Sequence, residues 1–440
     1  MKGKGAAGQL VQVWFALDPN DGRAEADLVN VRFTDGKVGD VEIKLVPLML
    51  KKNGYRIKER CKVTSIEYAS LLGETWVKSR ARKKLLSVLF IFYEYAGAES
   101  WTKSRVKKVL VWEVEKEQLK DLIRSDWERT YDFVEKGRAH EISEGHNAVL
   151  GASTSGAGGE ATYVTQPRNA DQPARKRAFS LKPAFLQTTY DWDASRDDFA
   201  SIKTLSDKVL GADLQKAILD GFEPYVGKTL GWIADELKIR KEVSAKQGPA
   251  ILVRRVLGIT NTKKRLLELE ALGVSPKIIP VRRHDLRPCE AMSFPVAKLK
   301  EVAEEEWEHS EFRANLDCLL MIPTLTEHCK KGDKWARILG RPFFWTPSDE
   351  EETGIEKEWE MYRKEILTGK AAYRIVDGLR KSNLTSSKQT EFIHMRPKGP
   401  DASVDDEDPL GNKTVQLCFW LNQAFVQKLL TDQHLRRRLV

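Results

Sequence analysis

The chain has 440 residues, of which 41% are hydrophobic, so it is too long for one ordinary domain and has the apolar material for packed cores. Lys plus Arg is 73 and Asp plus Glu is 64, which gives a net charge of +9 and a composition unlike that of a disordered chain. The longest apolar run, near Leu85–Tyr93, is about half of the roughly 20 residues that a membrane-spanning helix needs. No apolar signal core follows the N-terminus, so we expect a cytoplasmic protein that is not inserted in a membrane.

Taken in chain order, the first half alternates strand and helix patterns. Residues 41–46 (VEIKLV) and 87–95 (SVLFIFYEY) resemble strands, and residues 115–137 predict a helix that ends at Gly137. GASTSGAGG at 151–159 predicts a flexible loop between two strands. The acidic, polar segment 188–201 is typical of a linker, and 203–240 predicts short helices broken at Pro224 and Gly227.

The second half repeats the first. Trp127 and Gly137 match Trp359 and Gly369 at an offset of 232. The same kind of match is found at an offset of 231 for Trp76, Ser79 and Arg82 with Trp307, Ser310 and Arg313, at 233 for Val41, Lys44 and Pro47 with Val274, Lys277 and Pro280, and at 240 for FSLKPAF (179–185) with FWLNQAF (419–425). An ordered series with a slowly drifting offset indicates a duplicated domain. We therefore predict α/β domains at 1–190 and 241–440, each a mixed sheet flanked by helices, joined by a linker and helical connector at 191–240.

One constellation suggests chemistry. Strand alternation places Glu42 and Lys44 on one face, with Val41, Ile43 and Leu45 toward the core. With an upstream acid, this is the D…ExK layout of metal-dependent nucleases, in which two carboxylates hold Mg²⁺ and a lysine serves the attacking water. A bare ExK is more often a solvated strand face. The upstream acid stays open between Asp27, Asp35 and Asp40, because Asp40 shares the strand face of Glu42 and Lys44.

The repeat provides an internal control on that site. The second copy reads VSPKIIP at 274–280, so Lys277 stands where Lys44 stands, but Ser275 replaces Glu42. Serine cannot replace a metal-binding carboxylate. We therefore expect one catalytic copy and one inactive copy that binds DNA or regulates.

Charge supports a polyanionic partner for the first copy. Residues 51–110 hold ten Lys and five Arg against five Glu, a net charge of +10, so the other 380 residues sum to −1. A local basic stretch of this kind is typical of a nucleic-acid surface, and a solvated lysine-rich face is the ordinary alternative.

These motifs taken together resemble the MutH and Sau-three-A-I family of GATC-specific endonucleases. The family motif KGxxGxLxE corresponds to KGAAGQLVQ at 4–12, and the PDF…IELKxxP pattern corresponds to ADL at 26–28 followed by VEIKLVP at 41–47. The family pattern W…S…R…VLW corresponds to Trp76, Ser79, Arg82 and VLF at 88–90. In the second copy, RxxGxPxxWSPxEEE corresponds to RILGRPFFWTP at 337–347 with EEE at 350–352, and RPK stands at 396–398. The resemblance implies two tandem restriction-endonuclease-like domains of the PD-(D/E)xK, MutH-like type.

By the same resemblance, Asp27 and Glu42 would bind Mg²⁺ and Lys44 would serve the nucleophile. The family's helix glutamate is Gln12 here, and the residue before Asp27 is Ala26 instead of proline. The implied DNA contacts are Lys4 and Gly5, Arg82 and Lys84, a base-reading loop with Arg105, Lys107 and Lys108, an RPK-like segment with Arg168, and, in the second copy, Arg337, Arg341 and Lys398. Arg82 recurs as Arg313 in the inactive copy, so a fold-supporting ion pair is as plausible for it as a phosphate contact.

The duplicated architecture favours a type II restriction endonuclease that cuts double-stranded DNA at GATC with Mg²⁺ and leaves 5′ phosphates. Its second copy would bind a second DNA site as an effector, and a dimer on DNA is compatible with this scheme. The alternatives are a MutH-like nicking enzyme of mismatch repair and, because of Gln12, a sequence-specific DNA-binding protein that does not cleave. The cysteines form no CxxC pair and predict reduced core thiols, without a disulfide or zinc site: Cys61, Cys289, Cys318, Cys329 and Cys418.

Overall fold

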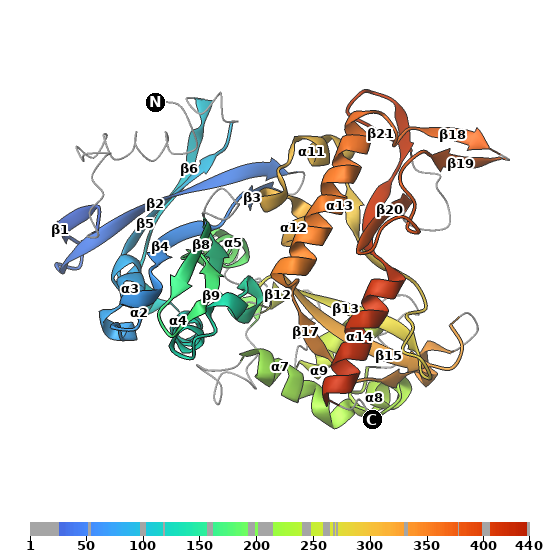
Figure 1. The fold of residues 1–440 in the computed structure, drawn as a ribbon, viewed down its shortest axis with the longest axis horizontal. Helices are drawn as coiled ribbons and strands as arrows, with labels where there is room; N and C mark the ends of the chain where they lie inside the picture. The colour runs from blue at the N-terminus through green and yellow to red at the C-terminus, as the bar shows by residue number, and fades with distance from the viewer. Residues whose placement is uncertain are drawn as a thin grey trace. The chain divides into compact units, whose positions relative to one another are not determined.

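The computed structural model describes residues 26–437, apart from 52–53, 97–102, 118, 156–161, 192–198, 201–213, 240–247, 258–264, 267–268, 270–271, 330–332, 377 and 398–404. The chain forms two compact units, which are described separately (Figure 1). The first contains residues 1–214 and 264–273, and the second contains 215–263 and 274–440. No helix in the described ranges is long and apolar enough to cross a membrane.

The first unit is built on a mixed sheet. Its order is β1-β2-β5-β6, with β3 also pairing with β2: β1 (Leu28–Arg32), β2 (Val38–Lys51), β5 (Val88–Glu94), β6 (Arg105–Trp112) and β3 (Gly54–Ile57). The pair β2–β5 is parallel, with Glu42 opposite Val88, and the other pairs are antiparallel. The parallel strands are buried on both faces, which explains why 41–48 and 88–92 are so apolar.

A smaller antiparallel sheet and short helices complete this unit. The sheet has the order β4-β10-β7: β4 (Cys61–Ile66), β10 (Arg177–Leu181) and β7 (Leu150–Thr154). A hairpin, β8 (Tyr163–Gln166) and β9 (Asn169–Arg175), stands beside it. The helices are α2 (Tyr68–Leu71), α3 (Arg80–Leu85), α4 (Lys120–Glu135) and α5 (Pro183–Asp191), with 3₁₀ turns η1 (Trp76–Lys78), η3 (Val114–Lys116), η4 (Ala139–Glu141) and η5 (Glu144–His146). The predicted flexible loop at 151–159 is wrong over its first residues, because 151–154 form buried strand β7 against β10.

The second unit repeats this plan. Its main sheet pairs β13 (Val274–Arg282) in parallel with β15 (Cys318–Thr326), and β15 pairs antiparallel with β16 (Ile338–Leu339) and β17 (Phe343–Trp345). Its small sheet has the order β14-β23-β20: β14 (Met292–Ala297), β23 (Leu417–Leu421) and β20 (Ile393–Pro397). The helices and turns are α11 (Leu299–Glu304), η9 (Trp307–His309), α12 (Glu311–Ala314), η10 (Lys334–Ala336), α13 (Asp349–Leu367) and α14 (Gln423–Arg437). Two hairpins are β18 (Tyr373–Val376) with β19 (Leu379–Ser382), and β21 (Asp405–Glu407) with β22 (Lys413–Val415).

Matching contacts confirm the predicted duplication. Ser79 Oγ accepts from the Arg82 N–H at 3.1 Å, and Ser310 Oγ accepts from the Arg313 N–H at 3.1 Å, so both short helices begin with the same N-cap. The tryptophans also pair alike, with ring centroids 6.0 Å apart for Trp76–Trp127 and 5.7 Å for Trp307–Trp359. Gly137 and Gly369 follow the long helices at φ +68 and +77, a backbone conformation that glycine adopts without strain.

Residues 215–239 of the predicted connector belong to the second unit. The connector contains α7 (Leu214–Phe222), η8 (Glu223–Tyr225) and α8 (Leu230–Glu236), and the break at Pro224 and Gly227 is confirmed. Helix α9 (Gly248–Val256) follows the predicted connector. Residues 227–230 extend the second sheet beside β16, because the Gly227 N–H donates to the Leu339 carbonyl at 2.8 Å and the Leu230 N–H donates to the Arg337 carbonyl at 2.8 Å. The boundaries at 190 and 240 remain predictions. A small parallel pair, β11 (Phe199–Ala200) and β12 (Arg265–Leu266), belongs to the first unit.

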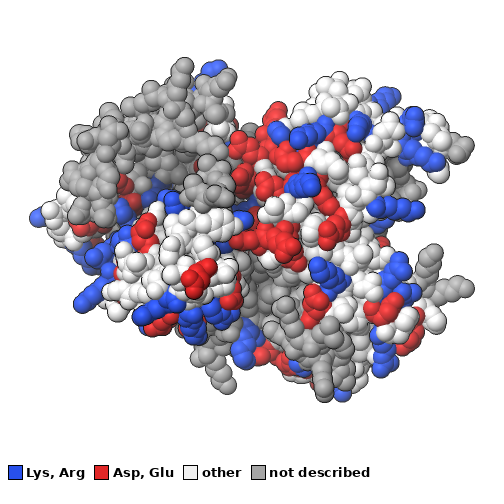
Figure 2. Space-filling model, viewed as in Figure 1, with Lys and Arg blue, Asp and Glu red and all other residues white. Residues whose placement is uncertain are grey.

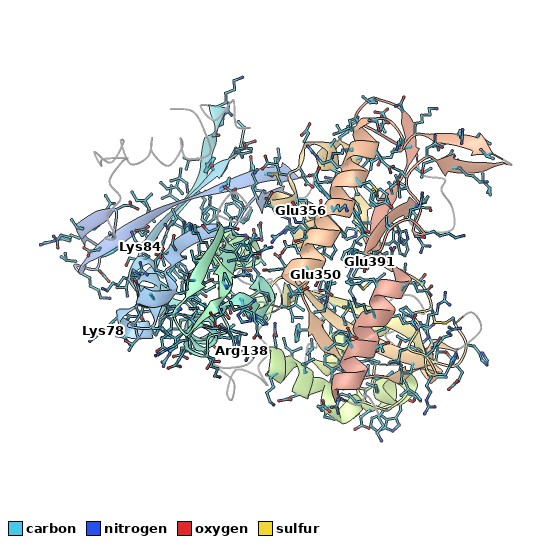
Figure 3. The ribbon with its side chains drawn as sticks, in the orientation of Figure 1. Lys78, Lys84, Arg138, Glu350, Glu356 and Glu391 are labelled. Atoms are coloured by element: carbon cyan, nitrogen blue, oxygen red, sulfur yellow. A yellow bond between two sulfur atoms is a disulfide. The ribbon has the colours of Figure 1, made fainter. Side chains whose placement is uncertain are left out.

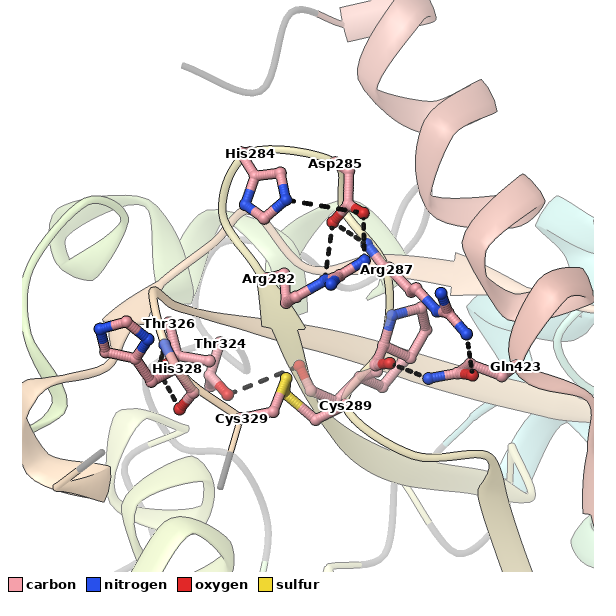
Figure 4. Close-up of a disulfide and its surroundings, with 12 residues drawn as sticks. Arg282, His284, Asp285, Arg287, Cys289, Thr324, Thr326, His328, Cys329 and Gln423 are labelled. Carbon is pink, nitrogen blue, oxygen red and sulfur yellow. Dashed lines mark hydrogen bonds and ion pairs between the residues drawn. A yellow bond between two sulfur atoms is a disulfide. The ribbon is translucent and has the colours of Figure 1, made fainter. Parts of the chain in front are cut away.

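The cysteine prediction was wrong for one pair. Cys289 and Cys329 form a disulfide with Cα atoms 5.2 Å apart (Figure 4). They are 40 residues apart in sequence, and the parallel pairing of β13 with β15 brings their segments together, so no short spacing could reveal them. Cys61, Cys318 and Cys418 are free and buried, as predicted.

Candidate active site

Glu42 and Lys44 lie on β2 and form an ion pair. Lys44 Nζ is 2.8 Å from Glu42 Oε1, which confirms that the two side chains share a face. The other face of β2 is apolar, as expected from Val41 and Ile43, but Glu42 is itself only 5% exposed. Because β2 is a central strand covered on both faces, the Glu42 carboxylate is a buried charge that needs compensating partners.

A second lysine approaches Glu42 from α3. Lys84 Nζ lies 2.7 Å from Glu42 Oε2, so each carboxylate oxygen contacts one ammonium group. The sequence pattern assigned Lys84 to DNA binding and gave no sign of this contact. Lys84 is 42 residues from Glu42, and only the packing of α3 beside β2 brings the two together.

Asp27 joins the same cluster from the start of β1. Its Oδ2 accepts a hydrogen bond from the Ile43 N–H at 2.8 Å, midway between Glu42 and Lys44 along β2. Asp40 has a different environment, since its Oδ1 accepts from the Asn30 N–H at 3.0 Å in an exposed position. The geometry favours Asp27 over Asp40 as the upstream acid, because the antiparallel pairing of Leu28 with Val41 places residue 27 beside the ExK strand.

Electrostatics keep Lys44 charged. Burial alone would lower the pKa of Lys44, but the neighbouring Cys61, Glu42 and Asp27 outweigh that effect and raise it. Burial raises the pKa of the Cys61 thiol to about 11, with Lys44 opposing the rise and Glu42 adding to it. The lysine is therefore an ammonium group held against a buried carboxylate at neutral pH, and Cys61 stays a thiol.

The residues suit a hard divalent cation only in part. Among the described residues, no three His, Cys, Asp or Glu side chains gather to hold a metal. Asp27 and Glu42 supply two carboxylates at the start of β1 and on β2, and oxygen donors of this kind are what Mg²⁺ prefers. Gln12, the third candidate from sequence, lies outside the described residues, as do Lys4 and Gly5. The two described carboxylates fit Mg²⁺ if water and backbone oxygens complete its coordination.

Arg82 contacts a glutamate. Its Nη2 lies 2.7 Å from Glu115 Oε1, and the equivalent Arg313 pairs with Glu352 at 2.6 Å in the second copy. The same type of ion pair in both copies favours the fold-supporting alternative for these arginines. For Arg313, burial would lower the pKa, but Glu352 and Asp317 more than offset this and raise it.

The predicted base-reading loop is a strand. Arg105, Lys107 and Lys108 belong to β6, which pairs with β5, so the loop assignment of this segment was wrong. β6 is an edge strand of the sheet, and its residues 105–107 are exposed. Lys107 Nζ lies 2.6 Å from a Glu94 oxygen and 5.0 Å from the Tyr55 ring centroid, and Lys108 Nζ donates to the Tyr190 carbonyl at 2.7 Å.

The two RPK-like segments are not equivalent. Arg168 lies in the exposed turn between β8 and β9, whereas Arg396 lies on β20. Leu181 and Leu421 are repeat partners at the offset of 240. Leu181 pairs with Leu150 on β7, and Leu421 pairs with Ile393 on β20, so β20 is the equivalent of β7. Arg396, three residues after Ile393, therefore corresponds to Ser153, three residues after Leu150. The equivalence of Arg168 with this motif was therefore wrong. Arg396 stacks over Trp420 at 3.8 Å from the ring centroid, and Lys398 lies outside the described residues.

The second copy lacks the acidic centre. Lys277 Nζ donates to the Ser293 carbonyl at 3.1 Å and lies 4.3 Å from the Phe294 ring centroid. Ser275 takes the place of Glu42, so this lysine contacts a carbonyl and a ring where Lys44 contacts a carboxylate. Of the predicted effector residues, Arg341 Nη2 pairs with Glu223 Oε2 at 3.0 Å, and Arg337 is partly buried on the segment that leads into β16.

Surface charge differs between the two copies. Basic residues gather on and around α3, including Lys78 and Lys84, whereas Glu350 and Glu356 belong to an acidic face around α13 (Figures 2 and 3). The segment before α3, residues 73–80, reads GETWVKSR, and its equivalent in the second copy, residues 304–311, reads EEEWEHSE. Burial and then repulsion from Glu308, Glu352 and Glu360 raise the pKa of Glu356. This acidic face is unsuited to a DNA backbone.

Comparisons with known proteins agree with this architecture. A family model described as the DNA mismatch repair enzyme MutH matches residues 23–126 and again 257–358. The type II restriction enzyme Sau3AI of Staphylococcus aureus is 24% identical over 464 aligned residues, which cover 98% of this chain and 93% of that protein. The MutH mismatch repair protein of Haemophilus influenzae (strain 86-028NP) is 27% identical over 220 residues, 48% of this chain and 92% of that protein. MutH of Vibrio cholerae is 27% identical over 223 residues, 49% of this chain and 95% of that protein.

The fold and the site define a protein with two tandem restriction-endonuclease-like domains. The domain of the MutH family is found twice in the chain, once in each half.

Proposed function

We propose that this chain is a type II restriction endonuclease that cleaves double-stranded DNA at GATC. The observation that carries this proposal is the asymmetry of the two copies. In the first copy, Asp27, Glu42, Lys44 and Lys84 lie together. On the equivalent strand of the second copy, Ser275 replaces Glu42 and Lys277 donates to a backbone carbonyl. The similarity to a type II restriction enzyme over 98% of this chain and 93% of that protein also supports the proposal.

The chemistry follows from the residues of the first copy. Asp27 and Glu42 would hold Mg²⁺, which when bound stabilises negative charge at the phosphorus. Lys44, kept protonated by its acidic neighbours, donates hydrogen bonds that orient the attacking water. Attack in line with the departing 3′ oxygen breaks the P–O3′ bond and leaves a 5′ phosphate. Lys84 Nζ, 2.7 Å from Glu42 Oε2, compensates the charge of this buried carboxylate before a cation binds.

For the second copy we propose an effector role. Arg337 and Arg341 precede and follow β16, on the segment that resembles the family's DNA-reading region, and Arg396 lies on β20. Binding of a second DNA site there would regulate cleavage by the first copy, and a dimer on DNA would provide two cutting sites. We place the enzyme in the cytoplasm, where its DNA substrate would be met.

Two other functions lead to different results. A MutH-like enzyme would nick one strand, and the matches to MutH proteins cover about half of this chain, which argues for the two-domain alternative. A protein that binds DNA without cleaving is suggested by Gln12 in place of an acid.

Digestion of methylated and unmethylated plasmid with Mg²⁺, followed by mapping of the ends, separates these functions. We expect linear products cut at GATC with 5′ phosphates. Nicked circles alone would indicate the MutH-like activity, and no product in any methylation state with retained binding would indicate the binding protein. A short GATC duplex added in trans should speed cleavage of a single-site substrate, and no acceleration would count against the effector role.

A further inference from the structure

The second copy carries a disulfide that the first copy does not have. The Lys58 N–H donates to the Pro47 carbonyl at 2.9 Å, and the Cys289 N–H donates to the Pro280 carbonyl at 2.8 Å. Because Pro47 and Pro280 are repeat partners, Lys58 stands where Cys289 stands. The Cys289–Cys329 bond is thus specific to the copy that lacks the acidic centre.

One end of this bond lies on a turn that is held independently. The Arg282 N–H donates to the Arg287 carbonyl at 2.9 Å and closes the turn after β13. Helix α14 holds the same turn, because Gln427 Nε2 donates to the Asp285 carbonyl at 3.0 Å and Gln423 donates to the Pro288 carbonyl (Figure 4). The turn that carries Cys289 is therefore held by hydrogen bonds as well as by the disulfide.

The other end lies where β15 ends. Cys329 follows the last residue of β15, Thr326, by three positions, and the chain continues toward η10 and Arg337. The disulfide is a covalent link from this exit to the turn held by α14. A covalent link reduces the number of conformations open to the chain that it joins, so it favours one arrangement of the basic residues that follow.

The pair is open to thiol–disulfide exchange. Both cysteines line a cavity of about 580 Å³ and are half-buried, whereas the three free cysteines are buried. Arg282, Arg287, Glu327 and His328 line the same cavity. A guanidinium group beside a thiol favours its thiolate, which is the attacking species in exchange, and the Glu327 carboxylate opposes this effect.

We propose that Cys289 and Cys329 are a redox-responsive pair that controls how tightly the second domain binds DNA. This rests on the proposed effector role of that domain. In oxidation by a small-molecule disulfide, one cysteine thiolate attacks a sulfur and releases one thiol. The second cysteine then attacks the mixed disulfide, which forms the Cys289–Cys329 bond and releases a second thiol. The two cysteines give up two protons and two electrons, and the reagent disulfide is reduced to two thiols.

The test uses the full chain after exposure to oxidised glutathione or to dithiothreitol. Thiol titration of the unfolded protein should give three thiols after oxidation and five after reduction, since the chain has five cysteines. Binding of a labelled GATC duplex is followed in EDTA, where cleavage is blocked. We expect reduction to weaken binding of the second duplex at least three-fold and to leave the first unchanged.

Two variants and one control sharpen the result. Cys289→Ser and Cys329→Ser should each bind like the reduced protein under both conditions. Cys418→Ala, which removes a buried free thiol, should keep the response to oxidation.

Equal binding in both states, with the thiol count changed, would overturn the proposal, and so would an unchanged thiol count. Binding of only one duplex in both states would overturn it together with the effector role. Plasmid cleavage with Mg²⁺ by the same samples tests the nuclease separately, so loss of the redox effect with cleavage intact leaves the proposed enzyme standing.

Discussion

Asp126 and Glu358 make the same contact in the two copies. The Asp126 carboxylate accepts hydrogen bonds from the N–H groups of residues 148, 149 and 150 at 2.7, 2.6 and 2.8 Å. The Glu358 carboxylate accepts from those of 391, 392 and 393 at 2.6, 3.0 and 2.8 Å. Each joins its long helix, α4 or α13, to the start of the strand that enters the small sheet.

Removing either carboxylate should destabilise its domain. Asp126→Ala leaves three N–H groups without their acceptor in a buried place, and we expect a loss of about 3 kcal/mol in the free energy of unfolding. Urea unfolding of wild type and variant measures this loss in the free energy of unfolding. The matched control is Asp132→Ala on the same helix, whose exposed pair with Lys136 should contribute less than about 1 kcal/mol. Equal effects of the two substitutions would contradict this role.

Glu42→Gln should abolish cleavage and keep DNA binding. The substitution preserves shape but removes the charge that Lys44 and Lys84 contact and that a cation would need. We expect at least a 1000-fold lower rate in a plasmid assay, the scale of a lost metal-binding carboxylate. Asp40→Asn on the same strand is the control and should cleave within about two-fold of wild type. Full loss with Asp40→Asn and none with Asp27→Asn would reverse the choice of upstream acid.

Lys84→Gln should slow cleavage more than it weakens binding. Lys84 Nζ donates to Glu42 Oε2, so its loss leaves one oxygen of a buried carboxylate without its ammonium partner. We expect a rate at least ten-fold lower, with DNA affinity changed less than three-fold. Lys83→Gln, one residue away and exposed, should instead affect binding and its salt dependence. If Lys84→Gln changes only the affinity for DNA and not the cleavage rate, Lys84 contacts a phosphate instead of supporting Glu42.

Lys44→Met and Lys277→Met should differ although they are repeat partners. Lys44→Met removes the group that would orient the water, and cleavage should be lost. Lys277 donates to a backbone carbonyl, so Lys277→Met should leave basal cleavage within about two-fold and change only stability. Comparable loss from both would indicate that the second copy is catalytic.

The first domain should lose stability as the pH falls below about 6.5, the ordinary pKa of histidine. Burial and then the charges of Arg129 and Arg177 lower the pKa of His146. The unfolded chain therefore binds a proton before the folded chain does. Stability is full above the unfolded value and declines as the pH drops toward the folded one, by up to about 1.4 kcal/mol per pH unit. Urea midpoints for wild type and His146→Gln between pH 5 and 7.5 measure this, and an identical slope in both would contradict it.

Several features of the protein follow from local patterns in its sequence. Repeat partners such as Trp127 and Trp359 predicted the duplication, and alternation along β2 predicted that Glu42 and Lys44 share a face. Ser275 indicated that the second copy lacks the acidic centre. These inferences succeed because side-chain direction in a strand and self-similarity in a chain are local properties.

Other features needed the tertiary structure. Lys84 reaches Glu42 across 42 residues, and Cys289 reaches Cys329 across 40, through the packing of elements whose spacing in sequence carries no signal. Arg105 to Lys108 were assigned to a loop by the resemblance to the family's base-reading loop, but pairing with β5 makes them a strand. Strand pairing also showed that the residue equivalent to Arg396 of the RPK segment is Ser153, and not Arg168.

The sequence alone determined that this protein is a duplicated α/β domain with one acidic centre, because composition, period and repeat are properties of the chain itself. Only the tertiary structure decided which groups come into contact. Lys84 pairs with Glu42, Asp27 accepts a hydrogen bond from the Ile43 N–H, and Cys329, just after β15, bonds to Cys289. The physical reason is that buried charges and covalent bonds depend on distances of a few ångströms between segments far apart in the chain, which the packing of strands and helices sets.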